Sequence, residues 1–309
     1  MFDSPLSASA YEVLQVDPTA DEEALRKAYR LRLRQTHPDT GGDAALFVQV
    51  QRAWELVGTP DARASYDRGH GFGAQAAPEW SGWKPQPRQT RDTRPRARSF
   101  GQPGGWRRER YLTLMREWVG RGVSLDDPYD PALVRSAPHH IRRLLADALA
   151  EEETARIVAD LGMGYTVWHD VDASGRDARP DVKVDHIVLG PSGLYAVLSE
   201  DFGGPVRVRR GEIIGDTVSG APIGDLVARL RVVARAARVK FSGAIVVLPD
   251  DDVMEMIDEI GKVRGTPIAV VGRSSLSAVL RRGITGARSM GGNEVFDVRT
   301  RLQQTVRFS

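Results

Sequence analysis

The chain has 309 residues, of which 41% are hydrophobic and 27% are charged, and its formal net charge is +2. This length allows about two domains with cores of their own, and the composition is ordinary for globular protein. The absence of cysteine excludes disulfides, zinc–thiolate sites and cysteine nucleophiles. No stretch approaches 18 apolar residues, and the first residues lack the pattern of a secretory signal. We therefore expect a cytoplasmic protein that has no membrane partner.

Helix signals dominate the first seventy residues. Ser9 with Glu12, and Thr19 with Glu22, have the spacing of capping boxes, which predicts a short helix and then a longer one ending near residue 35. Apolar residues of helical period predict a third helix after residue 42, and Pro60 predicts the start of a fourth. The second helix is expected to expose one basic face formed by Arg26, Lys27, Arg30 and Arg34.

The tripeptide His37-Pro38-Asp39 lies between the second and third predicted helices. Proline disfavours helical conformation in the residue before it and fixes its own backbone, so these residues are expected on an exposed turn. His37 and Asp39 would then point outward, and the sequence places no catalytic partner beside them. This pattern favours docking to another protein over catalysis.

The first seventy residues resemble a J domain, the module of DnaJ-type co-chaperones. The resemblance rests on residues 11–14, 28–30, 37–39, 47–56 and 66–67, in the order and spacing of that family. It implies an antiparallel helical hairpin with the tripeptide in its loop, and docking to a DnaK-type heat-shock chaperone whose ATPase it stimulates. The implied docking residues are His37, Pro38, Asp39, Arg26, Lys27, Arg30 and Arg34. No cofactor is expected on this chain, because the partner chaperone binds the ATP.

Residues 71–110 are rich in Gly, Pro, Gln and Arg and show no apolar period. Such a segment buries too little apolar surface to offset its ordering entropy, so we predict a flexible linker. Trp80, Trp83 and Trp106 are interleaved with arginines, a pattern typical of unspecific binding to single-stranded nucleic acid. A solvated tether is the preferred interpretation, and nucleic-acid binding is the alternative.

The rest of the chain predicts a helical connector over 111–137, an α/β sandwich with a mixed sheet over 138–285, and a C-terminal extension over 286–309 that could end in a strand. The predicted helices are 107–119, 138–161, 225–239, 253–260 and 276–281. The predicted strands are 165–171, 182–189, 194–198, 206–208, 244–248 and 268–271. Residues 190–193 have the composition of a tight hairpin turn.

Residues 185–197, with 168–171 and 204–208, resemble the NERD (nuclease-related) domain, a family with the PD-(D/E)XK nuclease fold. That chemistry needs an acid on the first helix, an aspartate on one strand, and an acid-x-Lys motif on the next. Two carboxylates then hold Mg²⁺ and the lysine acts on water. Asp185 matches the strand aspartate, and Glu151, Glu152 or Glu153 could supply the helix acid.

The third element of the nuclease motif fails. The acid position is Leu198 and the lysine position is Glu200, and leucine cannot bind magnesium. We expect a degenerate nuclease-like domain with no catalytic residue and no metal. In the alternative, Glu200 shares a strand face with Leu198 and binds metal beside Asp185. Asp185 also has a simpler interpretation as a hydrogen-bonded acid at the start of a buried strand.

The fold class predicted from the sequence is multidomain: an all-α J domain over residues 1–70, a flexible linker and a nuclease-like α/β sandwich. The predicted function is that of a co-chaperone whose second domain selects the client or the location. The alternative is a Mg²⁺-dependent nuclease or a nucleic-acid-binding protein that is recruited through the arginine-rich linker.

Overall fold

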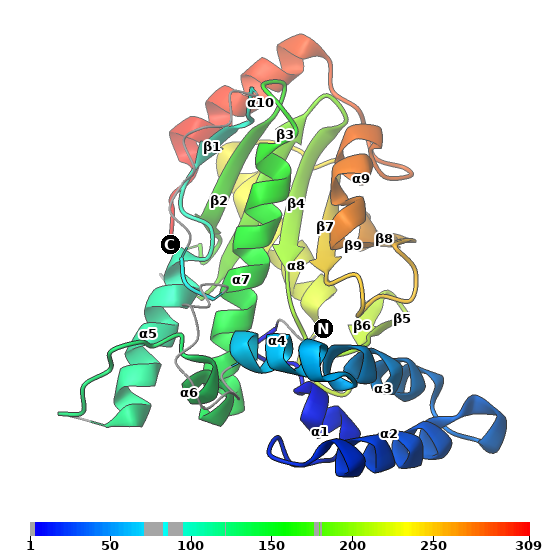
Figure 1. Ribbon diagram of the computed structural model, residues 1–309. Coiled ribbons are helices and arrows are strands. Elements are labelled where there is room, and N and C mark those ends of the chain that lie inside the picture. Colours follow the sequence, from blue (N-terminus) through cyan, green and yellow to red (C-terminus); the bar gives the residue numbers. More distant parts are fainter. Residues whose placement is uncertain (1–3, 71–82, 86–94, 121, 176–178, 180) are drawn as a thin grey trace.

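The computed structural model describes residues 4–70, 83–85, 95–120, 122–175, 179 and 181–309 (Figure 1). A small helical unit lies against one end of a larger α/β unit. The helical unit comprises α1 (Ala10–Leu14), α2 (Glu22–Thr36), the 3₁₀ turn η1 (Pro38–Thr40), α3 (Ala44–Val57) and α4 (Pro60–His70). This order agrees with the four helices and the turn that the sequence predicts.

Side-chain caps set where the first helices begin. The predicted capping box between Ser9 and Glu12 is present at α1. The predicted one at α2 is wrong, because Asp21 caps that helix and accepts a hydrogen bond from the backbone N–H of Ala24. Thr19 instead donates to the side chain of Asp17. Thr19 and Asp21 are both favourable N-cap residues close to the start of α2, and the sequence alone does not decide between them.

The helical unit has an apolar core of its own. The buried side chains come from all four helices and are Ala10, Tyr11, Leu14, Leu25, Val50, Ala53, Val57 and Tyr66. Tyr29 of α2 stacks on Trp54 of α3 with ring centroids 4.4 Å apart, which joins the two long helices. The hydroxyl of Tyr66 on α4 accepts a hydrogen bond of 2.8 Å from the N–H of Ala10. That bond satisfies a helix N-terminal donor that would otherwise be buried and unpaired.

The α/β unit contains a seven-stranded mixed sheet with strand order β1-β2-β3-β4-β7-β9-β8. Its strands are β1 (Arg98–Phe100), β2 (Thr166–Asp172), β3 (Lys183–Gly190), β4 (Gly193–Ser199), β7 (Gly243–Leu248), β8 (Ile257–Val263) and β9 (Thr266–Gly272). A separate hairpin is formed by β5 (Arg207–Arg209) and β6 (Glu212–Ile214). β4, β7 and β9 are parallel neighbours, so their carboxyl ends lie at one edge of the sheet.

Helices cover both faces of this sheet. The helices are α5 (Gly105–Val119), α6 (Pro131–Ser136), α7 (His139–Ala159), α8 (Pro222–Ala237), α9 (Leu276–Arg282) and α10 (Gly292–Thr305). The short 3₁₀ turn η2 (Arg273–Ser275) leads into α9. One face packs against α8 and α10, and the other against α7 and α9. α5 and α6 pack on the outer side of α7 around Tyr111, Met115 and Leu145.

The structure corrects two predictions about secondary structure and adds a helix to a third segment. The helix predicted over 253–260 is wrong, because β8 occupies 257–263 and returns to β9 through Arg264 and Gly265, both of positive φ. The predicted linker 71–110 includes β1 and the first turns of α5, while most of its other residues, Trp80 among them, lie outside the described residues. The predicted extension 286–309 contains α10, and Phe308 forms an isolated bridge to Val171.

Tertiary contacts explain why the linker prediction fails near its end. Phe100 of β1 stacks on Trp168 of β2, with ring centroids 6.0 Å apart. Trp83 is 3% exposed, and its carbonyl oxygen accepts a hydrogen bond from Arg108. These contacts join residues far apart in the sequence, so local composition contains no trace of them.

The helical unit contacts the α/β unit through polar and apolar groups. Arg52 of α3 forms an ion pair with Asp251, in the loop after β7. Leu6 packs against Gly203, where a Cβ atom would lie 2.7 Å from that of Leu6. In Figure 1, α3 and α4 lie between the sheet and α2, so α2 is the helix farthest from the sheet.

We predict that Tyr66→Phe lowers the free energy of unfolding of the helical unit by about 1–3 kcal/mol, because it leaves the buried N–H of Ala10 without its acceptor. Urea denaturation followed by circular dichroism measures the change. Tyr29→Phe is the matched control, since no hydrogen bond of its hydroxyl is found among the described residues, and it should change the stability by less than about 0.5 kcal/mol. Equal effects of the two substitutions would contradict this assignment.

Candidate functional site

The tripeptide lies on an exposed turn at the end of α2. His37 ends α2 and caps η1, and its Nδ1 accepts a hydrogen bond of 3.2 Å from the N–H of Asp39. Pro38 is the first residue of η1, where its missing N–H costs nothing. The side chain of Asp39 is 88% exposed, and its carboxylate lies 3.9 Å from the His37 ring. The carboxylate is therefore free to bond to a partner.

The rest of the loop holds this turn in one shape. The Thr40 hydroxyl donates to the carbonyl oxygens of Arg34 and His37, at 3.2 and 3.0 Å. The His37 ring packs edge-on against Phe47 of α3, with ring centroids 5.0 Å apart. Gly41 has a φ of +83°, a conformation that favours glycine at the end of the turn. The His37 ring is thus held in place by its contact with Phe47, while the Asp39 side chain extends into solvent.

A basic face runs along α2 beside the turn. Arg26, Lys27, Arg30 and Arg34 are all exposed, as predicted. Arg26 forms an ion pair with Glu22, one turn earlier. Among the described residues no carboxylate pairs with Lys27, Arg30 or Arg34. This exposed face can receive an acidic surface.

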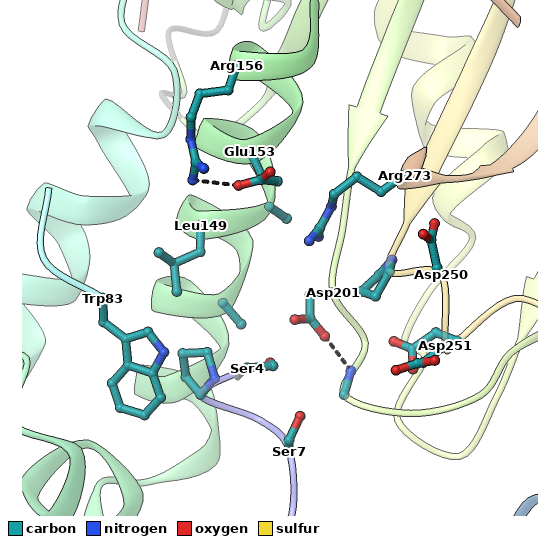
Figure 2. A pocket seen from close by; sticks show the side chains of 16 residues that line it. Ser4, Ser7, Trp83, Leu149, Glu153, Arg156, Asp201, Asp250, Asp251 and Arg273 are labelled. Atoms are coloured by element: carbon teal, nitrogen blue, oxygen red, sulfur yellow. Dashed lines mark hydrogen bonds and ion pairs between the residues drawn. The ribbon is translucent and has the colours of Figure 1, made fainter. Parts of the chain in front are cut away.

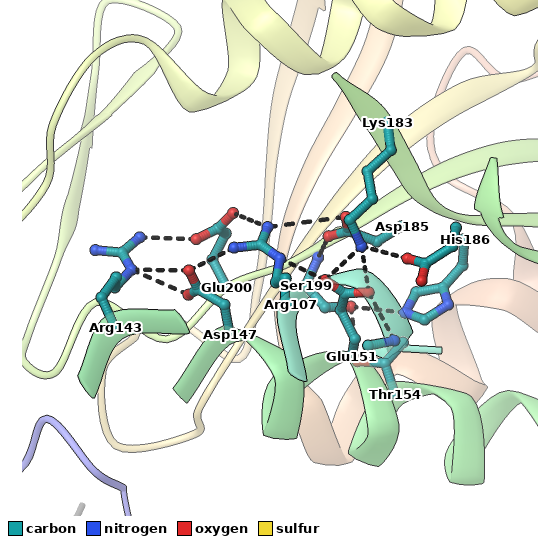
Figure 3. Close-up of polar contacts among 12 residues, drawn as sticks. Arg107, Arg143, Asp147, Glu151, Thr154, Lys183, Asp185, His186, Ser199 and Glu200 are labelled. Carbon is teal, nitrogen blue, oxygen red and sulfur yellow. Dashed lines mark hydrogen bonds and ion pairs between the residues drawn. The ribbon is translucent and has the colours of Figure 1, made fainter. Parts of the chain in front are cut away.

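A second group of charged side chains is buried between α5, α7 and the sheet (Figure 3). α7 contributes Arg143, Asp147, Glu151 and Thr154, which recur every three or four residues and so share one face. The other members are Arg107 of α5, Asp170 of β2, Lys183 and Asp185 of β3, and Glu200 directly after β4. We call these nine residues the buried charge network.

Lys183 forms one half of the buried charge network. Its side chain is 2% exposed, and its Nζ lies 2.7 and 2.6 Å from the two carboxylate oxygens of Glu151 and 3.4 Å from Oδ1 of Asp185. It also donates to Asp170. Asp170 has a φ of +52°, uncommon for a residue other than glycine, and this local strain turns its carboxylate toward the lysine.

Arg107 forms the other half. Its Nη2 lies 3.1 Å from Oε1 of Glu200 and 3.9 Å from Oδ1 of Asp185, and its guanidinium also pairs with Asp147 and Glu151. Arg143 completes the group, with Nη2 2.7 Å from Oε2 of Glu200 and Nε 3.0 Å from Oδ1 of Asp147. One guanidinium from α5 therefore touches acids from α7, β3 and the end of β4.

Five carboxylates in this network face only three cationic side chains, so two bound protons would make it neutral. Burial raises the pKa of Glu151 well above its usual range, and burial with the charge of Glu200 raises the pKa of Asp147 to about 8. Against the effect of burial, Lys183 and Arg107 lower the pKa of Asp185. Glu151 and Asp147 are therefore the two carboxylates of the network whose charged form is least favoured.

A chain of uncharged polar groups continues from the network. His169 and His186 are both buried, with their Nδ1 atoms 2.7 Å apart, so one of the two nitrogens must carry the hydrogen. His186 Nε2 lies 3.1 Å from the Ser199 hydroxyl, which donates to Thr154. Burial lowers the pKa of His186 to about 3, which keeps the ring neutral.

The structure separates two residues that the sequence places together. Leu198 packs in the apolar core on the α8 side of the sheet, whereas the Glu200 carboxylate turns toward α7. The expectation that they share a strand face is wrong, because β4 ends at Ser199 and the backbone turns after it. Of the three candidate helix acids, Glu151 joins the network, Glu152 pairs with Arg108 and Glu153 pairs with Arg156.

Comparison with known proteins identifies the first part of the chain. The family profile described as "DnaJ domain" matches residues 9–67. Residues 9–67 are a J domain. The chain is 37% identical over 71 residues to the "Curved DNA-binding protein" of Pseudomonas syringae pv. tomato, and 44% over 61 residues to "Chaperone protein DnaJ" of Thermosynechococcus vestitus. It is 49% identical over 65 residues to "Chaperone protein DnaJ" of Maricaulis maris.

These matches cover 19–22% of this chain and 16–23% of the relatives. The chain thus spans less than a quarter of the length of the curated relatives it matches, and the α/β unit lies outside the J domain match. None of the helices within the described residues is long and apolar enough to cross a bilayer.

Sequence reasoning missed Arg107 and Lys183. Lys183 lies two residues before Asp185 and therefore on the same strand side, which was a readable signal. The polar stripe along α7 was a second signal, since a buried helix seldom repeats charge at this period without a partner. Nothing in the sequence around Arg107 indicates burial, because its helix is brought to the network only by the fold.

We predict that the contribution of Asp147 to stability falls as the pH rises from about 4 to 8. The pKa of Asp147 is raised to about 8, above the unfolded value near 4, so its stabilising contribution is complete below about pH 4 and is lost as the pH passes 8. Urea denaturation at several pH values measures the slope. Asp147→Asn should remove up to about 1.4 kcal/mol per pH unit of that slope near pH 7. Asp297→Asn, at an exposed position of α10, is the control, and a slope that is unaltered in Asp147→Asn would contradict the assignment.

Proposed function

We propose that this protein is a co-chaperone that docks to a DnaK-type heat-shock chaperone and stimulates its ATPase. The observation that carries the proposal is the intact tripeptide on an exposed turn, beside a basic face on which Lys27, Arg30 and Arg34 have no carboxylate partner among the described residues. The J domain match and the relatives named as DnaJ chaperones support it. The partner supplies the ATP site, and both proteins would meet in the cytoplasm.

Two parts of the J domain would act at different stages of docking. Lys27, Arg30 and Arg34 would attract an acidic surface and speed the encounter, an effect that salt screens. Asp39 would then bond to a cationic side chain of the partner and favour the state of the ATPase that hydrolyses ATP. His37 and Pro38 fix the position of that carboxylate.

We further propose that the α/β unit selects the client or the location of the complex. The ion pair between Arg52 and Asp251, together with the packing of Leu6, would present the J domain at a fixed place beside it. The nuclease-related assignment remains part of this proposal, since it rests on the resemblance of residues 185–197. The name of the Pseudomonas relative refers to DNA, but the shared segment is only 22% of this chain. Nucleic-acid binding therefore stays the alternative.

A nuclease is the second candidate, and the structure supplies one observation in its favour. Glu200 occupies the lysine position of the nuclease motif. Lys183, on the same strand as Asp185, brings an ammonium group to that carboxylate and could take the place of the missing lysine. Arg107 argues against cleavage, because its guanidinium pairs with Asp147, Glu151 and Glu200 and so occupies the acids that would hold Mg²⁺. Within the described residues no group of three or more acidic or histidine side chains could hold a metal ion.

We predict that His37→Gln and Asp39→Asn each abolish stimulation of the chaperone's ATPase. The first removes the imidazole ring that holds the turn in place, and the second removes the negative charge that would pair with the partner. A single-turnover ATPase assay with a purified DnaK-type chaperone measures the rate. His140→Gln and Asp61→Asn make the same chemical changes at exposed positions away from the turn and should leave stimulation intact. A stimulated rate that survives in either tripeptide variant would refute the proposal.

We also predict that the full chain does not cleave single- or double-stranded DNA in the presence of Mg²⁺. Gel analysis of labelled substrates after prolonged incubation is the measurement. A contaminating nuclease would be unaffected by Asp185→Asn, so cleavage that persists in this variant does not come from this chain. Cleavage that disappears in Asp185→Asn would establish the nuclease alternative.

A further inference from the structure

A cavity of about 670 Å³ lies between the N-terminal segment, α7 and the carboxyl ends of β4, β7 and β9 (Figure 2). Loops that follow neighbouring parallel strands commonly form ligand sites, and this volume is in the range of small-molecule pockets. The cavity is separate from the buried charge network and from the docking turn. Its polar lining includes Ser7, Glu153, Arg156, Asp201, Asp250, Asp251, Asp252 and Arg273.

The carboxylates of this cavity are only partly matched by cations. Glu153 pairs with Arg156, and Asp251 pairs with Arg52 of α3, which does not line the cavity. Asp201 and Asp250 each accept one backbone N–H, from Gly203 and Ser274. These bonds leave oxygens free, and no ion pair reaches either aspartate among the described residues.

Two polar side chains of the cavity, Ser7 and Asp252, have no hydrogen-bond partner among the described residues and mark the cavity as a ligand site. Asp252 is 3% exposed, and within the described residues no hydrogen bond or ion pair reaches its carboxylate. Ser7 is 7% exposed, and its Oγ lacks a hydrogen-bond partner while pointing toward the cavity. Buried polar groups are normally satisfied, so an unmatched hydroxyl and an unmatched carboxylate on one cavity indicate a missing cation or donor.

The other residues that line the cavity restrict the size and shape of the cation that it could bind. Leu149, Ala146 and Ala150 of α7 form an apolar wall, with Pro249 and Trp83 beside it. The acids do not converge on one point, since no group of three or more in the described residues could hold a metal ion. An extended ligand with an aliphatic stem and a multi-donor cationic end fits both the wall and the spread acids.

We propose that this cavity binds an aliphatic ammonium or guanidinium group, with Asp252 and Asp201 on the cation and α7 along the stem. Two sources share this chemistry, the lysine or arginine side chain of a peptide and a free polyamine. The proposal does not depend on the co-chaperone function, because it rests only on residues of the cavity.

Isothermal titration calorimetry of the full chain at pH 8 and low ionic strength tests the proposal. The probes are the capped tripeptide Ala-Lys-Ala, the same peptide with norleucine in place of lysine, and spermidine. At least one of the two cationic probes should bind, and the norleucine peptide, which keeps the stem without the charge, should not. Binding of the lysine peptide alone would identify a peptide as the source, and binding of spermidine alone would identify a polyamine.

Substitutions then locate the binding. Asp252→Asn should weaken it by about tenfold or more, because it removes a charge-assisted hydrogen bond. Asp297→Asn on α10 should not change it. Since no hydrogen bond or ion pair of the Asp252 carboxylate is found in the described part of the chain, the amide should be accommodated, and a circular dichroism melt checks this. Asp201→Asn, which keeps the acceptor for Gly203, is the second variant if Asp252→Asn fails to fold.

The pH dependence gives a separate measurement. Burial and the charge of Asp201 raise the pKa of Asp252 to about 7. The other charged groups that face it are Glu153 and Arg156 of α7, Asp250 and Asp251 after β7, and Arg273 after β9. A cation prefers the ionised carboxylate, so affinity should fall about tenfold between pH 8 and pH 6 in the wild type. It should change little in Asp252→Asn.

Four results would overturn the proposal. They are the absence of binding by both cationic probes, equal binding of the norleucine peptide, affinity unaltered in both aspartate variants, and binding of calcium chloride that depends on Asp252. The last result would make the cavity a metal site. None of these measurements involves ATPase stimulation, so they can fail while the docking proposal stands.

Discussion

The guanidinium of Arg107 is the contact on which the assembly of the α/β unit depends. It joins α5 to α7, to β3 and to the residue that follows β4, and each of these contacts is made to a buried carboxylate. Removing one partner from a buried ionic group costs about 3–5 kcal/mol, because the others lose their compensating charge. The position of α5 is therefore specified by charge as much as by the apolar contacts of Tyr111 and Met115.

The J domain depends on a different kind of constraint, one that is local in sequence. Pro38, the Thr40 hydroxyl and Gly41 fix the turn through groups within seven residues of one another. The contact with Phe47 comes from the next helix. A site built from local interactions can be carried on many different chains, which fits a J domain match that covers 16–23% of the relatives.

This difference explains what the sequence could and could not predict. Capping patterns, the proline and the helical period predicted α1 to α4 and the exposed turn, because these signals act over a few residues. Five strands of the sheet, and β5 of the separate hairpin, were also predicted from the sequence, and the structure confirms them within two residues at each end. The strand β8 was predicted as a helix from the spacing of its apolar residues. The turn at Arg264 and Gly265, which pairs β8 with β9, was not recognised.

The candidate sites of the α/β unit were harder to predict because they depend on long-range pairing. Asp185 and Glu200 were found from a family resemblance, but their partners were not: Arg107 is separated from Glu200 by 93 residues, and only the fold brings them together. Leu198 was placed on the wrong side for a related reason, since the end of β4 is set by its neighbours in the sheet and not by its own sequence.

Glu200 and Asp201 show what this limit means for reading function from acids. They are adjacent in the chain and chemically alike, yet Glu200 turns toward α7 and pairs with two arginines. Asp201 lines the cavity, and no ion pair reaches it from the residues that the structure describes. A matched acid holds the fold together, and an unmatched one keeps free bonding capacity for a ligand. The distinction lies in the charge balance around each carboxylate. The search for function in this unit therefore belongs at the carboxyl ends of β4, β7 and β9, where that balance is incomplete.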